Sequence, residues 1–113
     1  MRPTLHPRLL NGRSGDPGLY VEALHLPAAV LFDCGDLSSL SPRHLLRVGA
    51  LCVSHAHMDH WADFDRLLRL HVGRAKHLPV IGPPGFARQL HHRLQSYTWN
   101  LVEPIPEELS FEV

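Results

Sequence analysis

A short apolar segment that runs into a histidine cluster constrains this fold most. ALCVS, residues 50–54, has the length and composition of a buried strand, and HAHMDH follows it at once. Residues two apart in extended chain point to the same side, so the imidazoles of His55 and His57 can close on one ion. Asp59 and His60 come where the chain begins to turn, and they can face the same ion or a second one beside it. The sequence therefore predicts a metal site at the carboxyl end of a strand.

The residue types of this cluster select the metal. Neutral imidazole together with carboxylate suits zinc, with iron or manganese as alternatives. Because the chain has ten histidines in 113 residues, a set of solvated loop residues is the competing interpretation. A complete HxHxDH pattern between an apolar strand and an amphipathic helix favours the metal site, since loops at the carboxyl ends of strands commonly carry the active sites of α/β proteins.

The segments around this loop alternate between strand and helix patterns. AAVLFD, residues 28–33, is a second apolar run of strand length, and Ser41 followed by Pro42 is a typical helix start. Beyond the cluster, two amphipathic segments flank a further short strand at residues 78–82. Their apolar faces are formed by Phe64, Leu67, Leu68 and Val72 in the first and by Phe86, Leu90, Leu94 and Tyr97 in the second. This alternation indicates an α/β protein.

The length of the chain predicts a single domain over residues 1–113. We expect this domain to be incomplete, because the sequence stops at LSFEV, which has the pattern of the first residues of another strand. Residues 1–17 are expected to form a loop-rich lead-in, with a loop over residues 11–18 where glycine is frequent. No segment approaches the roughly 20 apolar residues that cross a membrane, so we expect a soluble, cytoplasmic protein without membrane contact.

The charge balance limits the classes of partner. Eleven basic and eleven acidic residues leave no net charge when histidine is neutral, so the bulk basic surface that is usual in nucleic-acid binders is absent from the composition. This balance does not exclude RNA chemistry. Two cysteines are too few for a disulfide scaffold, and we expect both to be reduced and buried at strand positions.

The motif and its surroundings resemble a known family. SHAHMDH matches the HxHxDH signature of the metallo-β-lactamase superfamily of metal-dependent hydrolases. FDCG before the motif strand, and GPPG at residues 82–85 after the next strand, resemble the ribonuclease Z branch of that superfamily. The resemblance extends over most of the chain, from Asn11 to Val102.

This resemblance implies the amino-terminal half of an αββα sandwich that holds two zinc ions at the sheet edge. It assigns His55 and His57 to one ion, and Asp59 and His60 to the other. In such hydrolases a water that bridges the metals is the nucleophile. The ribonuclease Z branch also gives the aspartate at position 59 a part in proton transfer, so Asp59 is the catalytic candidate. The implied function is a phosphodiesterase, a ribonuclease Z-like endonuclease, with an RNA such as a tRNA precursor or another phosphodiester as substrate.

Two features depart from the family pattern. The family completes its site with a further His, a bridging Asp and a last His, and the later histidines do not fit these places. These are His71, His77, His91 and His92, each expected to be structural or solvated. Met58 stands where tRNA-processing members carry glycine, and no insertion resembles their arm for gripping tRNA.

These departures leave two alternatives open. The chain could hydrolyse another ester or a lactam, or it could be a shortened, non-catalytic chain that retains only part of the metal site. Separately, one sheet of a sandwich would expose an apolar face, so a homodimer is a candidate assembly. Met58 and Trp61 are expected to pack beneath the motif loop rather than to line a substrate pocket.

Overall fold

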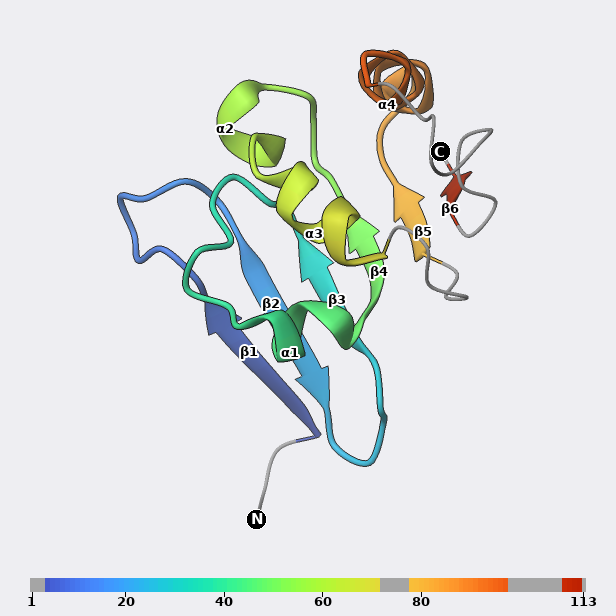
Figure 1. Cartoon of the computed structure of the whole chain (residues 1–113). Coiled ribbons are helices and arrows are strands. Elements are labelled where there is room, and N and C mark those ends of the chain that lie inside the picture. Colours follow the sequence, from blue (N-terminus) through green and yellow to red (C-terminus); the bar gives the residue numbers. More distant parts are fainter. Residues whose placement is uncertain (1–3, 72–77, 98–108, 113) are drawn as a thin grey trace.

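The computed structural model describes residues 4–71, 78–97 and 109–112 of the chain, the last segment by its backbone alone. These residues form a six-stranded sheet in which the strands follow sequence order (Figure 1). The strands are β1 (Leu5–Leu9), β2 (Leu19–Ala23), β3 (Ala29–Phe32), β4 (Val48–Cys52), β5 (Leu78–Ile81) and β6 (Leu109–Glu112). The pairs β1–β2 and β2–β3 are antiparallel, and β3 to β6 pair in parallel. The mixed α/β architecture expected from the alternating patterns is confirmed.

Short helices connect the parallel strands. They are α1 (Pro42–Leu46), α2 (Met58–Trp61), α3 (Phe64–His71) and α4 (Phe86–Gln95). Figure 1 shows α1 and α3 on one side of the sheet, with α2 beyond the ends of β3 and β4. As the sequence predicts, Ser41 caps α1 by accepting a hydrogen bond from the backbone N–H of His44, and Pro42 opens the helix. Among the helices that the structure describes, none is long and apolar enough to span a bilayer.

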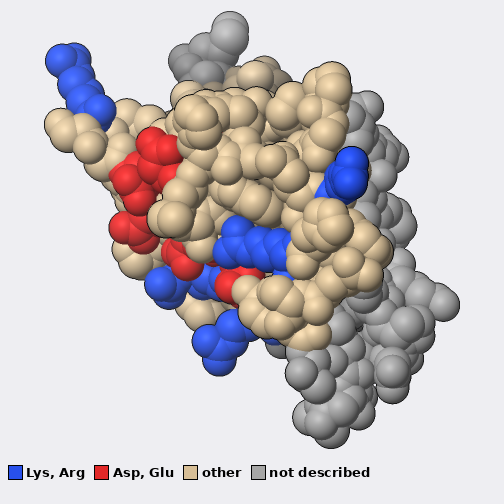
Figure 2. Space-filling view, turned by 90° about the horizontal axis from the view of Figure 1, so that it is seen from above, with Lys and Arg blue, Asp and Glu red and all other residues tan. Residues whose placement is uncertain are grey.

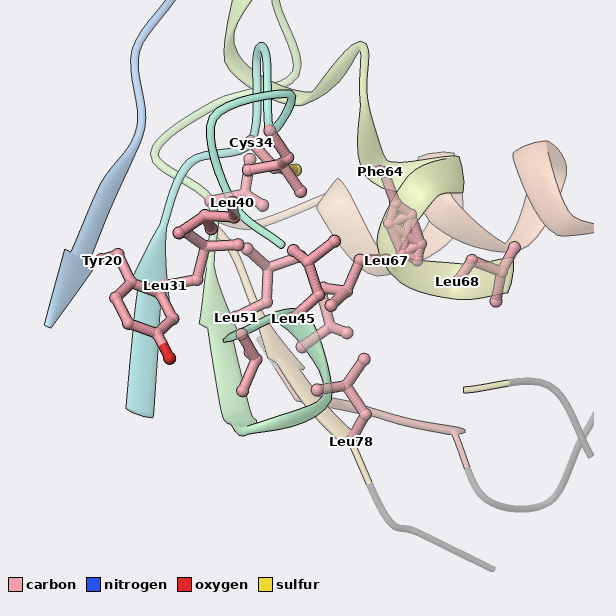
Figure 3. Packing of buried hydrophobic residues seen from close by; sticks show 14 of the residues in the cluster. Tyr20, Leu31, Cys34, Leu40, Leu45, Leu51, Phe64, Leu67, Leu68 and Leu78 are labelled. Carbon is pink, nitrogen blue, oxygen red and sulfur yellow. The ribbon is translucent and has the colours of Figure 1, made fainter. Parts of the chain in front are cut away.

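The core lies between the sheet and these helices. Leu31, Leu51 and Val80 are neighbours in register on β3, β4 and β5, and all are buried. Leu45 of α1 and Leu67 of α3 belong to the same buried cluster (Figure 3). Burial of each leucine contributes about 2 kcal/mol to folding. Buried and more exposed residues alternate along β3 and β5, so one face of the sheet packs against the helices.

The amphipathic patterns identified the buried faces of the two longer helices. Phe64, Leu67 and Leu68 of α3 are buried, while Val72 lies outside the described residues. The buried residues of α4 are Phe86, Leu90 and Leu94. Tyr97 lies after the end of α4 and is 40% exposed, so its place on the apolar face is not borne out.

Two boundaries need correction. The expected loop-rich lead-in over residues 1–17 contains β1, which pairs with β2 along its whole length. Pro7 made this segment look unlike a strand in the sequence. Leu10 N–H donates to Gly18 O on the β2 side, and the backbone nitrogens of alternate residues point to opposite edges of a strand. The nitrogen of Pro7 therefore faces the outer edge, where proline is tolerated. The amphipathic segment expected as a helix after the motif contains α3, whereas α2, which lies within the motif and ends at Trp61, is a separate helix that the sequence did not predict. Asp63 separates them because its N–H donates to Cys34 O and its carboxylate accepts from Leu37 N–H.

The opposite face of the sheet is apolar across five strands. Leu9, Leu19, Phe32, Cys52 and Ile81 are successive partners in register and form one row. Leu9 is 57% exposed, Phe32 43% and Ile81 38%. No helix that the structure describes covers this row, which we call the open-face row. A parallel row of apolar residues runs beside it, through Pro7, Val21, Val30 and Ala50.

We expect the 113-residue chain to self-associate through this face, because contiguous exposed apolar surface favours contact with other protein. Phe32→Thr should weaken the association while leaving the fold intact, since Phe32 is already 43% exposed. Light scattering over a range of concentrations measures this effect. Leu26→Thr is the matched control, because Leu26 is 59% exposed but lies in the β2–β3 connection, off the sheet. A chain that remains monomeric at every concentration would contradict the expectation.

Candidate metal centre

The histidine cluster occupies the loop between β4 and α2. Val53 N–H donates to Ile81 O, which extends the parallel pairing one residue beyond the strands. His57 then takes the N-cap position of α2 in an extended conformation, φ −65° and ψ 143°. The predicted path from strand through motif into helix is confirmed. It places the motif at the carboxyl ends of the parallel strands, where loops of α/β proteins commonly bind ligands.

The imidazole rings of the motif lie against one another. The ring centroids of His55 and His57 are 4.5 Å apart, and those of His55 and His60 are 3.9 Å apart. Asp59 Oδ2 lies 3.7 Å from His60 Nε2. The Asp59 side chain is 56% exposed and that of His60 only 20%, so the imidazole is held while the carboxylate remains in solvent.

This geometry fits zinc in part. Two ligands on one tetrahedral zinc with bonds of about 2.0–2.1 Å are roughly 3.4 Å apart, so the Asp59–His60 pair is close to the separation that a shared ion requires. Within the described residues, however, no group of three or more His, Cys, Asp or Glu side chains is arranged to hold an ion. The donor types and one pair distance suit zinc, and the assignment of all four ligands remains a prediction.

A polar network lies beneath the motif, and the sequence analysis did not identify it. Asp33, directly after β3, accepts hydrogen bonds from the backbone N–H of Ser54 at 2.7 Å and from its hydroxyl at 2.9 Å. His60 Nδ1 lies 2.8 Å from Asp33 Oδ2. The signal was present in the FDCG segment, because a carboxylate at the end of one parallel strand lies beside the end of the next.

Backbone hydrogen bonds attach the motif to the segment after β3. Cys34 N–H donates to His60 O at 2.8 Å, and Cys34 O accepts from Asp63 N–H at 2.9 Å. Gly35 permits this approach, because a Cβ at that position would overlap the carbonyl oxygen of Asp59. The glycine is therefore required by close backbone contact rather than by an unusual φ.

Arg93 of α4 holds the far end of α2. Its guanidinium donates to Trp61 O at 2.8 Å and to Ala62 O at 3.0 Å, and lies 4.6 Å from the centroid of the indole ring. Asp65 balances the charge at 3.2 Å. Trp61 itself donates through Nε1 to Ala56 O at 3.1 Å, so it packs beneath the motif loop as expected.

The remaining candidates from the sequence do not extend the motif. His91 and His92 are exposed on α4 and His71 is buried at the end of α3, in agreement with solvated and structural roles, respectively. His77 lies outside the described residues. Met58 is 79% exposed, so the expectation that it packs beneath the loop is wrong. As the first residue of α2 it points away from the core that Trp61 reaches.

The motif lies on an open, electrically mixed surface. A hollow of about 450 Å³ lies between α1 and α3 and is lined by Leu45, Asp65 and Arg69 among others, but by no residue of the motif. Figure 2, seen from beyond the carboxyl ends of the parallel strands, shows acidic and arginine side chains beside one another on the described part of this face. The described part of this face therefore carries charges of both signs.

Comparison with known proteins identifies the family. Residues 29–112 match the family model described as the beta-lactamase superfamily domain, a range that includes the whole motif. The chain belongs to this family. The matched range begins at β3 and ends at β6, so it contains every parallel strand of the described sheet.

Two curated relatives confirm the resemblance to ribonuclease Z. The chain is 43% identical over 74 residues to ribonuclease Z of Deinococcus radiodurans, covering 63% of this chain and 22% of that protein. It is 40% identical over 63 residues to ribonuclease Z of Treponema denticola, covering 50% of this chain and 20% of that protein. The matched part thus spans about a fifth of the length of these relatives.

Two solved structures share the fold. The metallo-beta-lactamase fold protein YhfI from Bacillus subtilis superposes with a TM-score of 0.66 at 21% identity, over 96% of this chain and 44% of that one. The short form of human tRNase Z gives a TM-score of 0.56 at 16% identity, over 81% of this chain and 38% of that one. The expected fold class is confirmed, and the chain corresponds to part of the metallo-β-lactamase fold.

Gly35→Ala should lower the free energy of unfolding by about 1–3 kcal/mol, because the new Cβ forces the Asp59 backbone away. Thermal unfolding followed by circular dichroism should show a fall of at least about 4 °C. Gly12→Asn is the control, because Gly12 has φ +68° with open space at its Cβ, and asparagine tolerates this conformation. Equal losses in both variants would refute the close contact.

Burial raises the pKa of the Cys34 thiol to about 12, while burial and then the Asp33 carboxylate also raise the pKa of Cys52, which is only half-buried on the open face and so remains accessible. Near pH 8, Ellman's reagent should therefore modify Cys52 in the native chain and both thiols in guanidinium. Because an unfolded thiol has a pKa of about 8.5, the free energy of unfolding should fall as the pH rises above that value, where only the unfolded state loses the proton. Fast modification of Cys34 in native Cys52→Ala protein would contradict the burial.

Proposed function

We propose that this chain carries part of the metal site of a ribonuclease Z-like phosphodiesterase. The observation that carries the proposal is the gathering of the HxHxDH side chains at the end of β4, with Asp59 Oδ2 3.7 Å from His60 Nε2. Relatives named ribonuclease Z, at 43% and 40% identity, support the choice of branch. Both observations favour metal-dependent hydrolysis as the class of reaction.

His55 and His57 would hold one zinc ion, and Asp59 and His60 the other, with iron or manganese as alternatives. A bound zinc acts as a Lewis acid that stabilises the negative charge developing on a phosphoryl group. Because the Asp59 side chain is 56% exposed, the carboxylate oxygen that does not bind the ion would accept or return a proton at the surface where a substrate would lie. Asp59 is therefore the catalytic residue that we propose.

The substrate that we propose is RNA, with a tRNA precursor as the leading candidate and other phosphodiesters as the nearest rivals. The names of the relatives support this choice, while the mixed charge of the described surface supplies little attraction for a phosphate backbone. A cytoplasmic location is part of the same proposal. An ester or lactam substrate, or a chain that binds metal without catalysis, are the competing outcomes.

The 113-residue chain should bind zinc weakly and turn over little substrate, because catalytic zinc normally has three protein ligands and this mapping supplies two per ion. Calorimetric zinc titration should show Asp59→Asn weaker still, and His92→Ala, on the exposed face of α4, unchanged. In a protein that carries the complete fold, Asp59→Asn should slow hydrolysis of bis(p-nitrophenyl) phosphate by about two to four orders of magnitude.

Several results would overturn parts of this proposal. Activity within a few-fold of the parent would remove Asp59 from the mechanism. Tight, stoichiometric binding of two zinc ions by the isolated chain, with turnover, would show that other residues of this chain complete the site. Hydrolysis of nitrocefin or a thioester in preference to the phosphodiester would move the substrate to the rival classes.

A further inference from the structure

We infer that Arg93 is a positioning residue that fixes the two halves of the motif, His55–His57 and Asp59–His60, relative to each other. Its guanidinium reaches the second half through the backbone at the end of α2. It reaches the first half through the indole ring of Trp61. The positioning itself needs no metal, whereas its consequence for zinc binding rests on the proposed function.

The carbonyl groups at the end of α2 are held from two directions. Carbonyls in this position have no partner within the helix and need donors from elsewhere. His60 O accepts from Cys34 N–H at 2.8 Å. Trp61 O and Ala62 O both accept from Arg93, at 2.8 and 3.0 Å. One guanidinium can bind both carbonyls because its N–H groups form a rigid, planar fork. Arg93 therefore holds α2 on the side away from Cys34.

Trp61 carries the same constraint to the first half of the motif. Its Nε1–H donates at 3.1 Å to the carbonyl oxygen of Ala56, the residue between the first two histidines. The guanidinium carbon of Arg93 lies 4.6 Å from the centroid of the indole ring, where the ring quadrupole attracts a cation. The ring of Phe86, at 5.0 Å, contacts the same indole. One indole thus joins α4 to the middle of the first half.

The charge of Arg93 is balanced and partly shielded from water. Its side chain is 20% exposed, and its Nη2 lies 3.2 Å from Asp65 Oδ1. The hydroxyl of Tyr97 donates to Asp65 Oδ2. This hydrogen bond, followed by burial, raises the pKa of Tyr97, so the hydroxyl keeps the proton that it donates. A carboxylate bound on both oxygens holds the guanidinium in one orientation, which an isolated surface ion pair does not.

The two halves lie close enough for a small movement to matter. The ring centroids of His55 and His60 are 3.9 Å apart, and this contact crosses from one half to the other. His55 precedes α2 and His60 lies within it, so a rotation of α2 changes this separation first. Side chains that bind a metal must be held to within about 0.5 Å of their productive geometry. A residue that braces both halves supplies such a constraint.

Arg93→Gln tests the inference, because it removes the fork and the charge while keeping a good helix former. The indole N–H of Trp61, assigned from a Trp61→Phe sample, should exchange with water about tenfold faster, since its bond to Ala56 O opens more often. Nuclear Overhauser cross-peaks between the rings of His55 and His60 should be lost. An arginine that only stabilised the fold would lower the unfolding temperature and leave both signals unchanged in folded protein.

Two further variants complete the test. Arg88→Gln is the matched control, because Arg88 is exposed on the same helix, and both signals should keep their parent values. Arg93→Lys keeps a positive charge beside Asp65 but replaces the fork by a single ammonium group. We expect it to unfold near the parent temperature and still to show faster exchange of the Trp61 N–H. It decides the question if Arg93→Gln does not fold.

Zinc added during the same spectra separates this inference from the proposed function. It should bind Arg93→Gln about tenfold more weakly than the parent, because the halves no longer keep their separation. Unchanged signals in every folded Arg93 variant, or equal changes in Arg88→Gln, would overturn the positioning role. Changed signals with unchanged zinc binding would support that role and overturn the metal assignment of the motif. Changed signals with weaker zinc binding, and none in Arg88→Gln, support both.

Discussion

The parallel pairing of β3 with β4 is the interaction on which the rest of the site depends. It brings the residues that follow each strand to the same edge of the sheet, so that Asp33 N–H reaches Cys52 O and Cys34 N–H reaches His60 O. Each of these bonds joins the FDCG segment to the motif or to the strand before it. The motif is therefore held by main-chain hydrogen bonds, while the side chain of Asp59 is left in solvent.

Periodic and local features of this fold could be predicted from the sequence. The start of α1 follows from Ser41 and Pro42, and the buried faces of α3 and α4 follow from the spacing of their apolar residues. The position of the motif between strand and helix follows from its order in the chain. These features depend on neighbours in sequence, which a pattern can reveal.

The features that the sequence did not reveal depend on residues far apart in the chain. The break between α2 and α3 arises because Asp63 is bonded to Cys34 and Leu37, and neither partner is local. The role of Asp33 depends on a positive φ combined with the register of β3 against β4. For the candidate site, the motif predicted which residue types gather, but not that no three of them, among the described residues, are arranged to hold an ion.

The outer edge of the sheet determines how far any association can extend. Pro7 lies in β1 with its nitrogen directed away from β2, so this edge lacks a donor that a further strand would need. A sheet can grow without limit only if both of its edge strands can pair with a further strand, and Pro7 removes one of the hydrogen bonds that β1 would need for such pairing. We therefore expect contact between copies at the open-face row, where two stacked sheets would cover each other's apolar surface. Such stacking would close after one pair, which favours a small discrete assembly over a fibril.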